Sequence, residues 1–392
     1  MAFFFPAWRS SRLSYCLLSK CGLPRGNFLA RTHHPALFAE AAKVFDNQAT
    51  RCIAELYDIK VAGCQDTLDT LYLPCREGGL GVQYLQPTLP FAYAASVSAA
   101  TGGNHPTQTT CASDLHAVNR ARLEASSPLT ARRLGAASMK HASAFLRDCW
   151  GSSEPKAFAA AVRFRLGLAS ASHPDRLMCA CGVVFPAALF ADHCSGCGKL
   201  SAPNRIATHD AVAPVLSNQM KESEHAVLTT IRPTQFESFL CRGCDELFSR
   251  NEITAHTTTC ALTHPGALRA PLRSGPDLAV EVFGALRLLY DQTVAHVMAP
   301  SNLGYTDVQL EDSLHEKKNR LYLDQAKLNG YSFSCLVFFS LGGLGTKTRN
   351  ELRDVASLLG LDPIDFCDRT SAAVMMGVGR SISNALAIAM KK

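Results

Sequence analysis

Hydrophobic and polar positions change their spacing along this chain, and the change separates a helical first part from a mixed last part. Up to residue 168, apolar side chains recur at intervals of three and four, most clearly over residues 39–57, 112–150 and 157–168. Pro74 and the glycines of residues 78–81 mark a turn between the first two stretches. The pattern predicts helices joined by loops, with one or two amphipathic helices over residues 112–150.

The last third alternates strands and helices. Apolar runs over residues 278–283 and 286–297 flank Gly284, a spacing that predicts a β-hairpin. The segments expected after it are a charged helix, an apolar strand and a second helix, over residues 311–326, 333–339 and 347–359. This order, strand–strand–helix–strand–helix, is typical of an α/β domain.

Neither end of the sequence predicts a membrane segment. The apolar stretch over residues 370–390 is interrupted by Arg380 and weakened by Gly377 and Gly379. A membrane span needs ~20 consecutive apolar residues, so we expect a core or docking helix there. The apolar run before Arg9 is shorter than the apolar part of a secretory signal.

Composition is that of a globular protein: 47% of the 392 residues are hydrophobic and 18% are charged. This length corresponds to about two to three domains. The formal net charge of +6 permits nucleic-acid binding without requiring it. The 16 cysteines are the unusual feature, and in a long chain without a secretory signal they favour a reducing compartment and metal binding.

Two segments share a cysteine and histidine spacing that is typical of zinc sites. The first reads C-x-C-x11-H-x3-C and the second C-x2-C-x11-H-x3-C. In both, a phenylalanine lies four residues after the second cysteine and an apolar residue lies three before the histidine. The predicted ligands are Cys179, Cys181, His193 and Cys197 in the first module and Cys241, Cys244, His256 and Cys260 in the second.

This layout suits a structural zinc ion. Two close cysteines place their thiolates on one turn, and a histidine and cysteine four apart share one face of a helix. Four such ligands close a tetrahedral shell and leave no open position, so each predicted zinc is structural. The alternative is a chance set of buried cysteines, and the matched spacing favours zinc. Arg205, Arg242 and Arg250 could contact phosphates or be ordinary surface charge.

Two aspartates in the predicted hairpin form a candidate catalytic pair. Asp277 opens the first strand and Asp291 lies in the second, at positions that come opposite each other around Gly284. Their carboxylates could share one Mg²⁺, which takes one or two carboxylates together with water and phosphate oxygens. A lysine on the next helix, Lys317 or Lys318, could offset charge at a phosphate. This combination suits hydrolysis of a phosphodiester.

Geometry alone leaves other interpretations open. Paired aspartates in a hairpin are more often turn or surface residues, although Asp291 lies in an apolar run where a buried charge needs a partner. Glu281 is a competing metal ligand, and Glu222 or Glu224 could be a further acidic ligand. A one-residue shift of the pairing near Val282 and Phe283 would turn the side chains to the other face of the sheet.

The order of short motifs resembles the C-terminal part of non-LTR retrotransposon polyproteins that carry a restriction-enzyme-like endonuclease. One position departs from the family's pattern: Thr208 stands where the family has an arginine directly before the histidine and aspartate that correspond to His209 and Asp210. In chain order, the motifs are residues 24–29 with Arg31, residues 44–46, Leu73–Pro74 with residues 78–81, residues 165–168 before the first zinc module, His209 and Asp210, Pro276 and Asp277, Asp291, Lys318, and residues 333–345.

The resemblance implies a PD-(D/E)XK-like α/β endonuclease domain that nicks target DNA with Mg²⁺, so that the freed 3′ hydroxyl primes reverse transcription. It implies that Asp277 and Asp291 hold the metal and that Lys318 assists at the phosphate, with Lys317 as the alternative. No paired-aspartate polymerase motif is present, so no reverse transcriptase activity is expected. The second zinc module lies where the family is shorter, and it could add DNA contacts or be an insertion of a subgroup.

The expected fold class is therefore α+β or α/β, with a helical N-terminal region, two small zinc modules and the endonuclease domain. The alternative function is a non-catalytic, zinc-stabilised nucleic-acid-binding protein from a decayed retroelement, and a third is a structural zinc protein that binds proteins. Expected partners are target DNA and element RNA, with nuclear location inferred from the DNA. The expected domains are residues 1–150, a remnant of the polymerase thumb and connection; 151–215, a linker helix and the first zinc module; 216–262, the second zinc module; and 263–392, the endonuclease.

Overall fold

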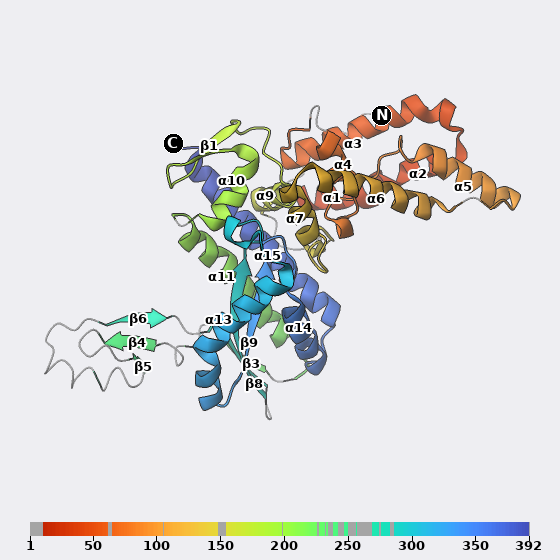
Figure 1. The fold of residues 1–392 in the computed structure, drawn as a ribbon. Coiled ribbons are helices and arrows are strands. Elements are labelled where there is room, and N and C mark those ends of the chain that lie inside the picture. The colour runs from red at the N-terminus through yellow and green to blue at the C-terminus, as the bar shows by residue number, and fades with distance from the viewer. Residues whose placement is uncertain are drawn as a thin grey trace.

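Helices make up most of the chain, and the described strands form three small sheets, in the computed structural model of this protein (Figure 1). A helical N-terminal part lies at one end of the molecule and the four-stranded sheet at the other, with the long helix α15 (Pro363–Ala389) between them (Figure 1). The predicted mixture of helices and strands is confirmed. The structure describes residues 11–61, 65–104, 106–147, 154–197, 199–225, 227–231, 233, 238–241, 247–249, 256, 269–273, 276–282 and 286–391.

The N-terminal part is helical, as predicted. The expected stretch over residues 112–150 is divided, because Ser127 is extended before Pro128 and its side chain accepts the Leu129 N–H at the start of a new helix. The helices are α1 (Ser11–Leu17), the π-helix η1 (Leu18–Gly22), α2 (Pro24–Thr32), α3 (Pro35–Tyr57), α4 (Gln65–Tyr72), the 3-10 helix η2 (Cys75–Glu77), α5 (Leu89–Thr101), α6 (Gln108–Ser126), α7 (Pro128–Ala137), α8 (Ala144–Arg147) and α9 (Pro155–Leu166).

A four-stranded sheet forms the core of the last third. Its order is β3-β7-β8-β9, with β3, β7 and β8 antiparallel and β9 parallel to β8. The predicted hairpin around Gly284 and the strand–strand–helix–strand–helix order are confirmed. The elements are α11 (Ser201–Lys221), β3 (Val227–Ile231), β7 (Leu278–Val282), β8 (Leu286–Ala295), the 3-10 helix η4 (Pro300–Asn302), α13 (Asp307–Leu328), β9 (Ser332–Phe339) and α14 (Thr346–Leu358).

Helices cover both faces of this sheet. Leu288 and Tyr290 of β8 pack with apolar residues of α11, α14 and α15, whereas Leu289, on the other face, packs with Ala326 of α13. Side chains alternate between the two faces along a strand. Asp291 therefore faces α13, the helix that carries Lys318.

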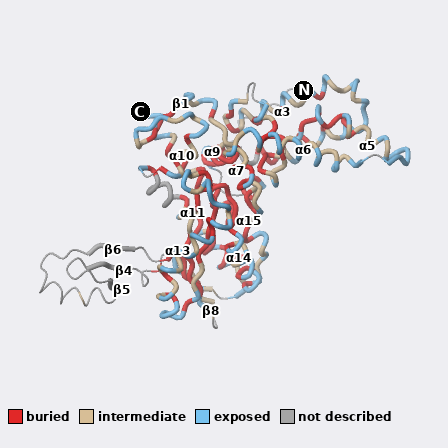
Figure 2. Tube along the Cα trace, in the orientation of Figure 1, coloured by how far each residue is buried: buried red, intermediate tan, exposed pale blue. Residues whose placement is uncertain are grey.

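Helix α15 is a core helix, as the interrupted apolar pattern predicts. It packs against α8, α9, α11 and α14, and buried residues follow its length (Figure 2). Gly377 and Gly379 permit this, because a Cβ at Gly377 would lie 2.9 Å from Thr208 Cα and one at Gly379 only 2.1 Å from Ala157 O. In the described part of the chain, α15 is the one helix long and apolar enough to cross a membrane, and most of it is buried inside the fold.

One expected domain boundary falls inside a helix, and another separates two strands that pair with each other. The boundary after residue 215 falls inside α11, and β3, expected within the second zinc module, pairs with β7 from Val227↔Val282 to Ile231↔Leu278. Pairing between strands this far apart in the chain leaves no local pattern in the sequence. Between β3 and β7, the strands β4 (Ser238–Cys241), β5 (Leu247–Ser249) and β6 (Arg269–Arg273) form a separate antiparallel sheet in the order β5-β4-β6.

Candidate functional sites

The first predicted zinc module folds as a hairpin followed by a helix. Strands β1 (Arg176–Met178) and β2 (Val184–Pro186) pair, and α10 (Ala187–Gly196) follows directly. The turn between the strands closes through hydrogen bonds from Cys179 N–H to Val183 O and from Gly182 N–H to Cys179 O, both 2.9 Å. Gly182 has a φ of +88°, which glycine adopts without steric cost.

Four ligand atoms converge between this turn and α10. The atoms of Cys179, Cys181, His193 and Cys197 that could bind a metal all lie within 4.8 Å of one another. Cys179 Sγ is 3.6 Å from Cys197 Sγ, and Cys181 Sγ is 3.4 Å from His193 Nε2. With zinc–sulfur and zinc–nitrogen bonds of ~2.3 and ~2.0 Å, a tetrahedral shell has ligand separations of ~3.8 and ~3.5 Å. The cluster is therefore compatible with a zinc ion.

The module shares its apolar core with the rest of the protein. Phe190 is fully buried, and the ring of Phe185 stacks on that of His193 at 3.9 Å between centroids. The cluster around Phe190 includes Ala385 and Ala389 of α15. Both phenylalanines occupy the core positions that the sequence predicts, and the module is anchored on the end of α15.

The second predicted zinc module lies largely outside the described residues. The described residues do not include Cys244, Cys260, Arg242 and Arg250, and they do not include the side chains of Cys241 and Arg205. His256 is described, but its neighbours in the chain are not. The backbone pairs Leu240↔Leu247 and Phe239↔Phe248 of the β4–β5 hairpin. In the first hairpin, Met178 pairs with Val184 and Leu177 pairs with Phe185. The paired positions of the two hairpins therefore lie at the same distances along the chain from the two predicted cysteines of their module. Within the described residues, one complete group of zinc ligands is present, that of the first module.

The candidate nuclease residues meet where β7 and β8 adjoin α13. Lys318 Nζ lies 2.7 Å from Asp291 Oδ2, and Asp291 is only 3% exposed. Lys317 is exposed and makes no ion pair among the described residues. Of the two lysines that the sequence left as alternatives, Lys318 is the one beside Asp291. It is also 5.8 Å from the centre of the Tyr322 ring, one helical turn further on.

Asp277 is held at the start of β7 by its backbone and its carboxylate. Its N–H donates to Tyr290 O at 2.9 Å, and its Oδ2 accepts the Gln292 N–H at 2.6 Å. The register Leu278↔Tyr290 extends to bring Asp277 opposite Asp291, as the spacing around Gly284 predicts.

His209 on α11 is a member of this cluster that the sequence analysis noted only as part of a motif. Its Nε2 lies 2.7 Å from Asp277 Oδ2 and its Nδ1 3.5 Å from Asp210 Oδ1. Thr208, which departs from the family pattern, is buried against Ser381 of α15, with their hydroxyl oxygens 3.1 Å apart. The signal for His209 in the sequence was the two-residue motif alone, because α11 and β7 meet only in the fold.

The charges of these groups act on one another. Burial, followed by the negative charge of Asp277, raises the pKa of Asp291 to about 6, while Lys318 and His209 act in the opposite direction. Burial alone would lower the pKa of His209, and its hydrogen bond to Asp277 raises it above the ordinary value. Lys318 follows the same pattern: burial opposes its charge, and Asp291 raises its pKa. Two carboxylates and two groups whose raised pKa values favour their positive form thus lie together in a largely buried place.

This donor set fits a magnesium ion. Mg²⁺ binds through one or two carboxylates and completes its shell with water and phosphate oxygens. Asp277 and Asp291 would supply the two carboxylates, and the charge of a bound cation would favour the ionised form of Asp291, whose pKa is raised by burial and then by Asp277. A cavity of about 230 Å³ adjoins Asp277, between α11 and the end of β3, and its lining includes His209, Asp210 and Ile231.

Three other acids considered from the sequence lie apart from this cluster. Glu281 accepts a hydrogen bond from the Tyr331 hydroxyl near the far end of β7. Glu222 makes two hydrogen bonds of 2.6 Å with Arg369, and Glu224 is exposed. Gln292, in contrast, was not singled out, although it is 2% exposed and its side-chain amide atoms lack a hydrogen-bond partner in the described structure.

No protein-family model matches this chain, and no curated protein sequence matches it. The resemblance to retrotransposon endonucleases therefore rests on the order of its motifs.

Proposed function

We propose that this protein is a Mg²⁺-dependent DNA endonuclease of the kind found in non-LTR retrotransposons. The observation that carries the proposal is the convergence of Asp277, Asp291, Lys318 and His209 where β7 begins beside the middle of β8. The expected reaction is hydrolysis of one phosphodiester bond of target DNA. The oxygen of water bonds to phosphorus, the bond from phosphorus to the 3′ oxygen breaks, and that oxygen takes up a proton to leave a 3′ hydroxyl and a 5′ phosphate.

Each side chain has a role that follows from its contacts. Asp277 and Asp291 hold the magnesium ion, which when bound polarises the phosphate and lowers the pKa of a water molecule. The ammonium group of Lys318, next to Asp291, offsets negative charge that develops on the phosphate. His209 and the Gln292 N–H both bind Asp277 Oδ2 and fix the direction of that carboxylate.

Zinc has a structural role in this proposal. Cys179, Cys181, His193 and Cys197 close a four-ligand shell that leaves no position for a substrate. The equal register of the two hairpins supports a second zinc ion in the β4–β5 module. That module is inserted between the paired ends Ile231 and Leu278, directly beside Asp277. It is therefore attached at the rim of the candidate nuclease site.

The alternative is a zinc-stabilised nucleic-acid-binding protein without catalytic activity. One observation favours it: protein groups already contact both carboxylates, at 2.7 Å from Lys318 Nζ to Asp291 and 2.7 Å from His209 Nε2 to Asp277. Structural ion-pair networks also perturb pKa values in this way.

Plasmid nicking separates the two functions. The full chain is incubated with supercoiled plasmid, with and without Mg²⁺, and compared with Asp277→Asn, Lys318→Met and the matched control Lys317→Met. We expect Mg²⁺-dependent nicking, a loss of about a hundredfold or more in the first two variants, and a rate near wild type for Lys317→Met. Equal nicking by wild type and Asp277→Asn, or no nicking by wild type, would overturn the nuclease in favour of the binding protein.

A further inference from the structure

Basic side chains gather where α14 meets the loop before α8, on the face of the sheet opposite Lys318. Arg349 and Arg353 lie one turn apart on α14, so both project from the same side of the helix. Like charges at this spacing destabilise a helix. Neither guanidinium has an ion pair within the described part of the chain, and Arg353 is exposed.

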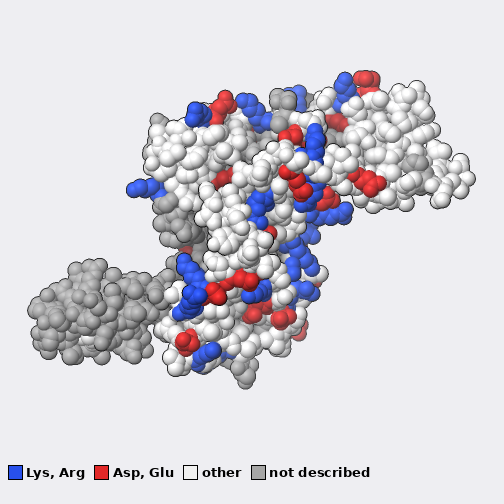
Figure 3. Space-filling model, in the orientation of Figure 1, with Lys and Arg blue, Asp and Glu red and all other residues white. Residues whose placement is uncertain are grey.

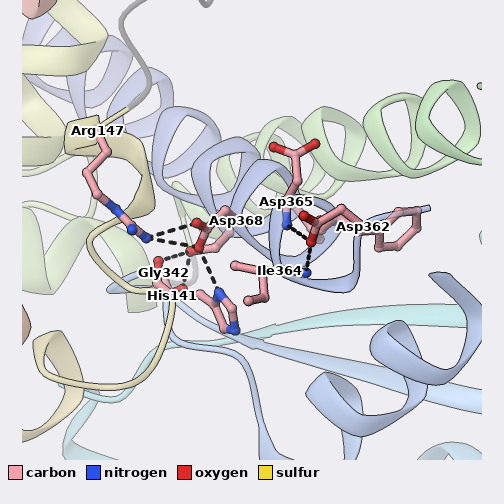
Figure 4. Close-up of polar contacts among 10 residues, drawn as sticks. His141, Arg147, Gly342, Asp362, Ile364, Asp365 and Asp368 are labelled. Atoms are coloured by element: carbon pink, nitrogen blue, oxygen red, sulfur yellow. Dashed lines mark hydrogen bonds and ion pairs between the residues drawn. The ribbon is translucent and has the colours of Figure 1, made fainter. Parts of the chain in front are cut away.

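The loop of residues 139–143 brings Lys140 to the same place and is fixed there. The Ser371 hydroxyl of α15 is shared between His141 O at 2.8 Å and Gly342 O at 2.6 Å. His141 Nδ1 lies 2.7 Å from Asp368 Oδ1, and Figure 4 shows the two side chains pointing toward each other. A Cβ at Gly343, just before α14, would meet Met139 Sδ at 2.6 Å. The loop, α14 and α15 are thus held in fixed relative positions.

Arg147 adds a fourth positive charge. Its guanidinium is exposed and binds both carboxylate oxygens of Asp368, at 3.1 and 2.9 Å (Figure 4). The one acid among these contacts is therefore already paired. Burial raises the pKa of the nearby Cys367 thiol to about 11, and the positive charges of Arg353, Arg349 and Lys140 act against this rise. The charges of these three cations therefore act on the same turn of α15.

The basic surface consists of Lys140, Arg147, Arg349 and Arg353. Its positive charge suits phosphates, and its described segments have no exposed aromatic ring on which a base could stack. Proteins that bind single strands combine positive charge with exposed aromatic rings on which bases stack. In the described segments that form this surface, the two aromatic side chains, Phe145 and Phe366, are buried. Rigidly placed cations without aromatic rings match the regular phosphate backbone of a duplex.

We propose that this basic surface, Lys140, Arg147, Arg349 and Arg353, binds the backbone of duplex DNA outside the site of Asp277 and Asp291. Figure 3 shows basic side chains along the edge of the molecule beside α14. The choice of DNA rests on the proposed function, because a nuclease for DNA must hold the duplex beyond the bond it cuts. The surface contributes affinity and orientation without sequence readout, since phosphates carry no sequence information.

The salt dependence of binding tests this surface. Binding of a fluorescent DNA duplex to the full chain is measured without Mg²⁺ over a range of salt concentrations. The test variant is Arg349→Glu/Arg353→Glu, and the matched control is Lys43→Glu/Arg51→Glu, which makes the same charge change on exposed positions of α3. Lys140→Glu, in an exposed loop position, repeats the test on another segment. Circular dichroism melting establishes that each variant is folded.

We expect the α14 double variant to weaken duplex binding at least about tenfold and to lower the slope of log affinity against log salt by about 2, one phosphate contact for each arginine. Lys140→Glu should lower it by about 1, and the α3 control should leave it unchanged. If the salt-dependence slopes of the α14 and Lys140 variants equal that of the α3 control, the proposal that this surface binds DNA is overturned. A loss of binding to single-stranded RNA without a loss for duplex DNA would also overturn it.

The result is separate from that of the nuclease proposal. Asp277→Asn should bind duplex DNA like wild type, and Arg349→Glu/Arg353→Glu should still nick plasmid at saturating protein concentration. If wild type binds duplex DNA through this surface but does not nick plasmid, the DNA-binding proposal is supported and the nuclease proposal is refuted. If wild type nicks while the α14 variant binds normally, the surface alone is refuted.

Discussion

Replacing Asp291 by asparagine is expected to make the protein more stable at neutral pH when Mg²⁺ is absent. Asp291 is 3% exposed, and burial together with the charge of Asp277 raises its pKa from 3.8 to about 6. A carboxyl group with a raised pKa in the folded state stabilises the fold while it is protonated. That contribution is complete below about pH 4 and is lost as the pH rises through about 6.

The size of the effect follows from the pKa difference. A rise of ~2 units corresponds to ~3 kcal/mol between the protonated and the ionised protein at neutral pH. This value already contains the attraction of Lys318, because that ion pair contributes to the Asp291 pKa. Asparagine resembles the protonated carboxyl in shape and charge. The free energy of unfolding of Asp291→Asn should therefore exceed that of wild type by about 2–3 kcal/mol near pH 7.5, and nearly equal it near pH 4.

Urea unfolding followed by circular dichroism, at both pH values, measures this difference. Adding Mg²⁺ should stabilise wild type by binding the native carboxylates and should leave Asp291→Asn unchanged. Asp312→Asn, an exposed acid on the same helix as Lys318, is the matched control and should change stability by less than about 1 kcal/mol. An Asp291→Asn variant less stable than wild type at neutral pH would refute the reasoning.

Three further predictions concern other parts of the fold. Cys197→Ser should lower the zinc content by one ion per chain, measured by mass spectrometry of the purified protein, whereas the buried neighbour Cys194→Ser should retain it; equal zinc in both would contradict the ligand set. Arg165→Met should lower the free energy of unfolding in urea by about 3 kcal/mol or more. The reason is that the fully buried guanidinium donates to two carbonyls and a hydroxyl, which would lose their partner. A decrease below about 1 kcal/mol would show that these hydrogen bonds contribute little. Burial lowers the pKa of His296 to about 4. The neutral imidazole therefore stabilises the fold above about pH 6.5, and up to ~3 kcal/mol of this stability is lost as the pH falls to about 4. His296→Gln should remove this part of the pH dependence of the free energy of unfolding, and identical profiles for wild type and variant would disprove the prediction.

The features that sequence analysis predicted are those with a local signature. The ligands of the first zinc module are close in the chain, and the hairpin register follows from the distance of Asp277 and Asp291 from Gly284. Lys318 lies on a helix that the sequence predicts after the hairpin, and the resemblance favoured it over Lys317. Such features depend on few residues and on backbone geometry that is the same in every protein.

The features that were missed depend on tertiary packing. The pairing of β3 with β7 joins segments separated by the inserted module, and nothing in the five residues of β3 specifies that partner. His209 reaches Asp277 only because α11 crosses α15 closely at Gly377 and runs along the sheet. The two glycines that weakened the helix expected over residues 370–390 are the positions where α15 contacts its neighbours most closely. Their effect on packing outweighs their low helix propensity.

The nicking rate of Asp291→Asn on supercoiled plasmid with Mg²⁺ tests the central claim most directly. This variant is expected to be more stable than wild type, so a loss of activity cannot be attributed to unfolding. The account predicts a rate lower than wild type by about a hundredfold or more. A rate within a few fold of wild type would contradict the claim that the Asp277 and Asp291 carboxylates together hold a catalytic Mg²⁺.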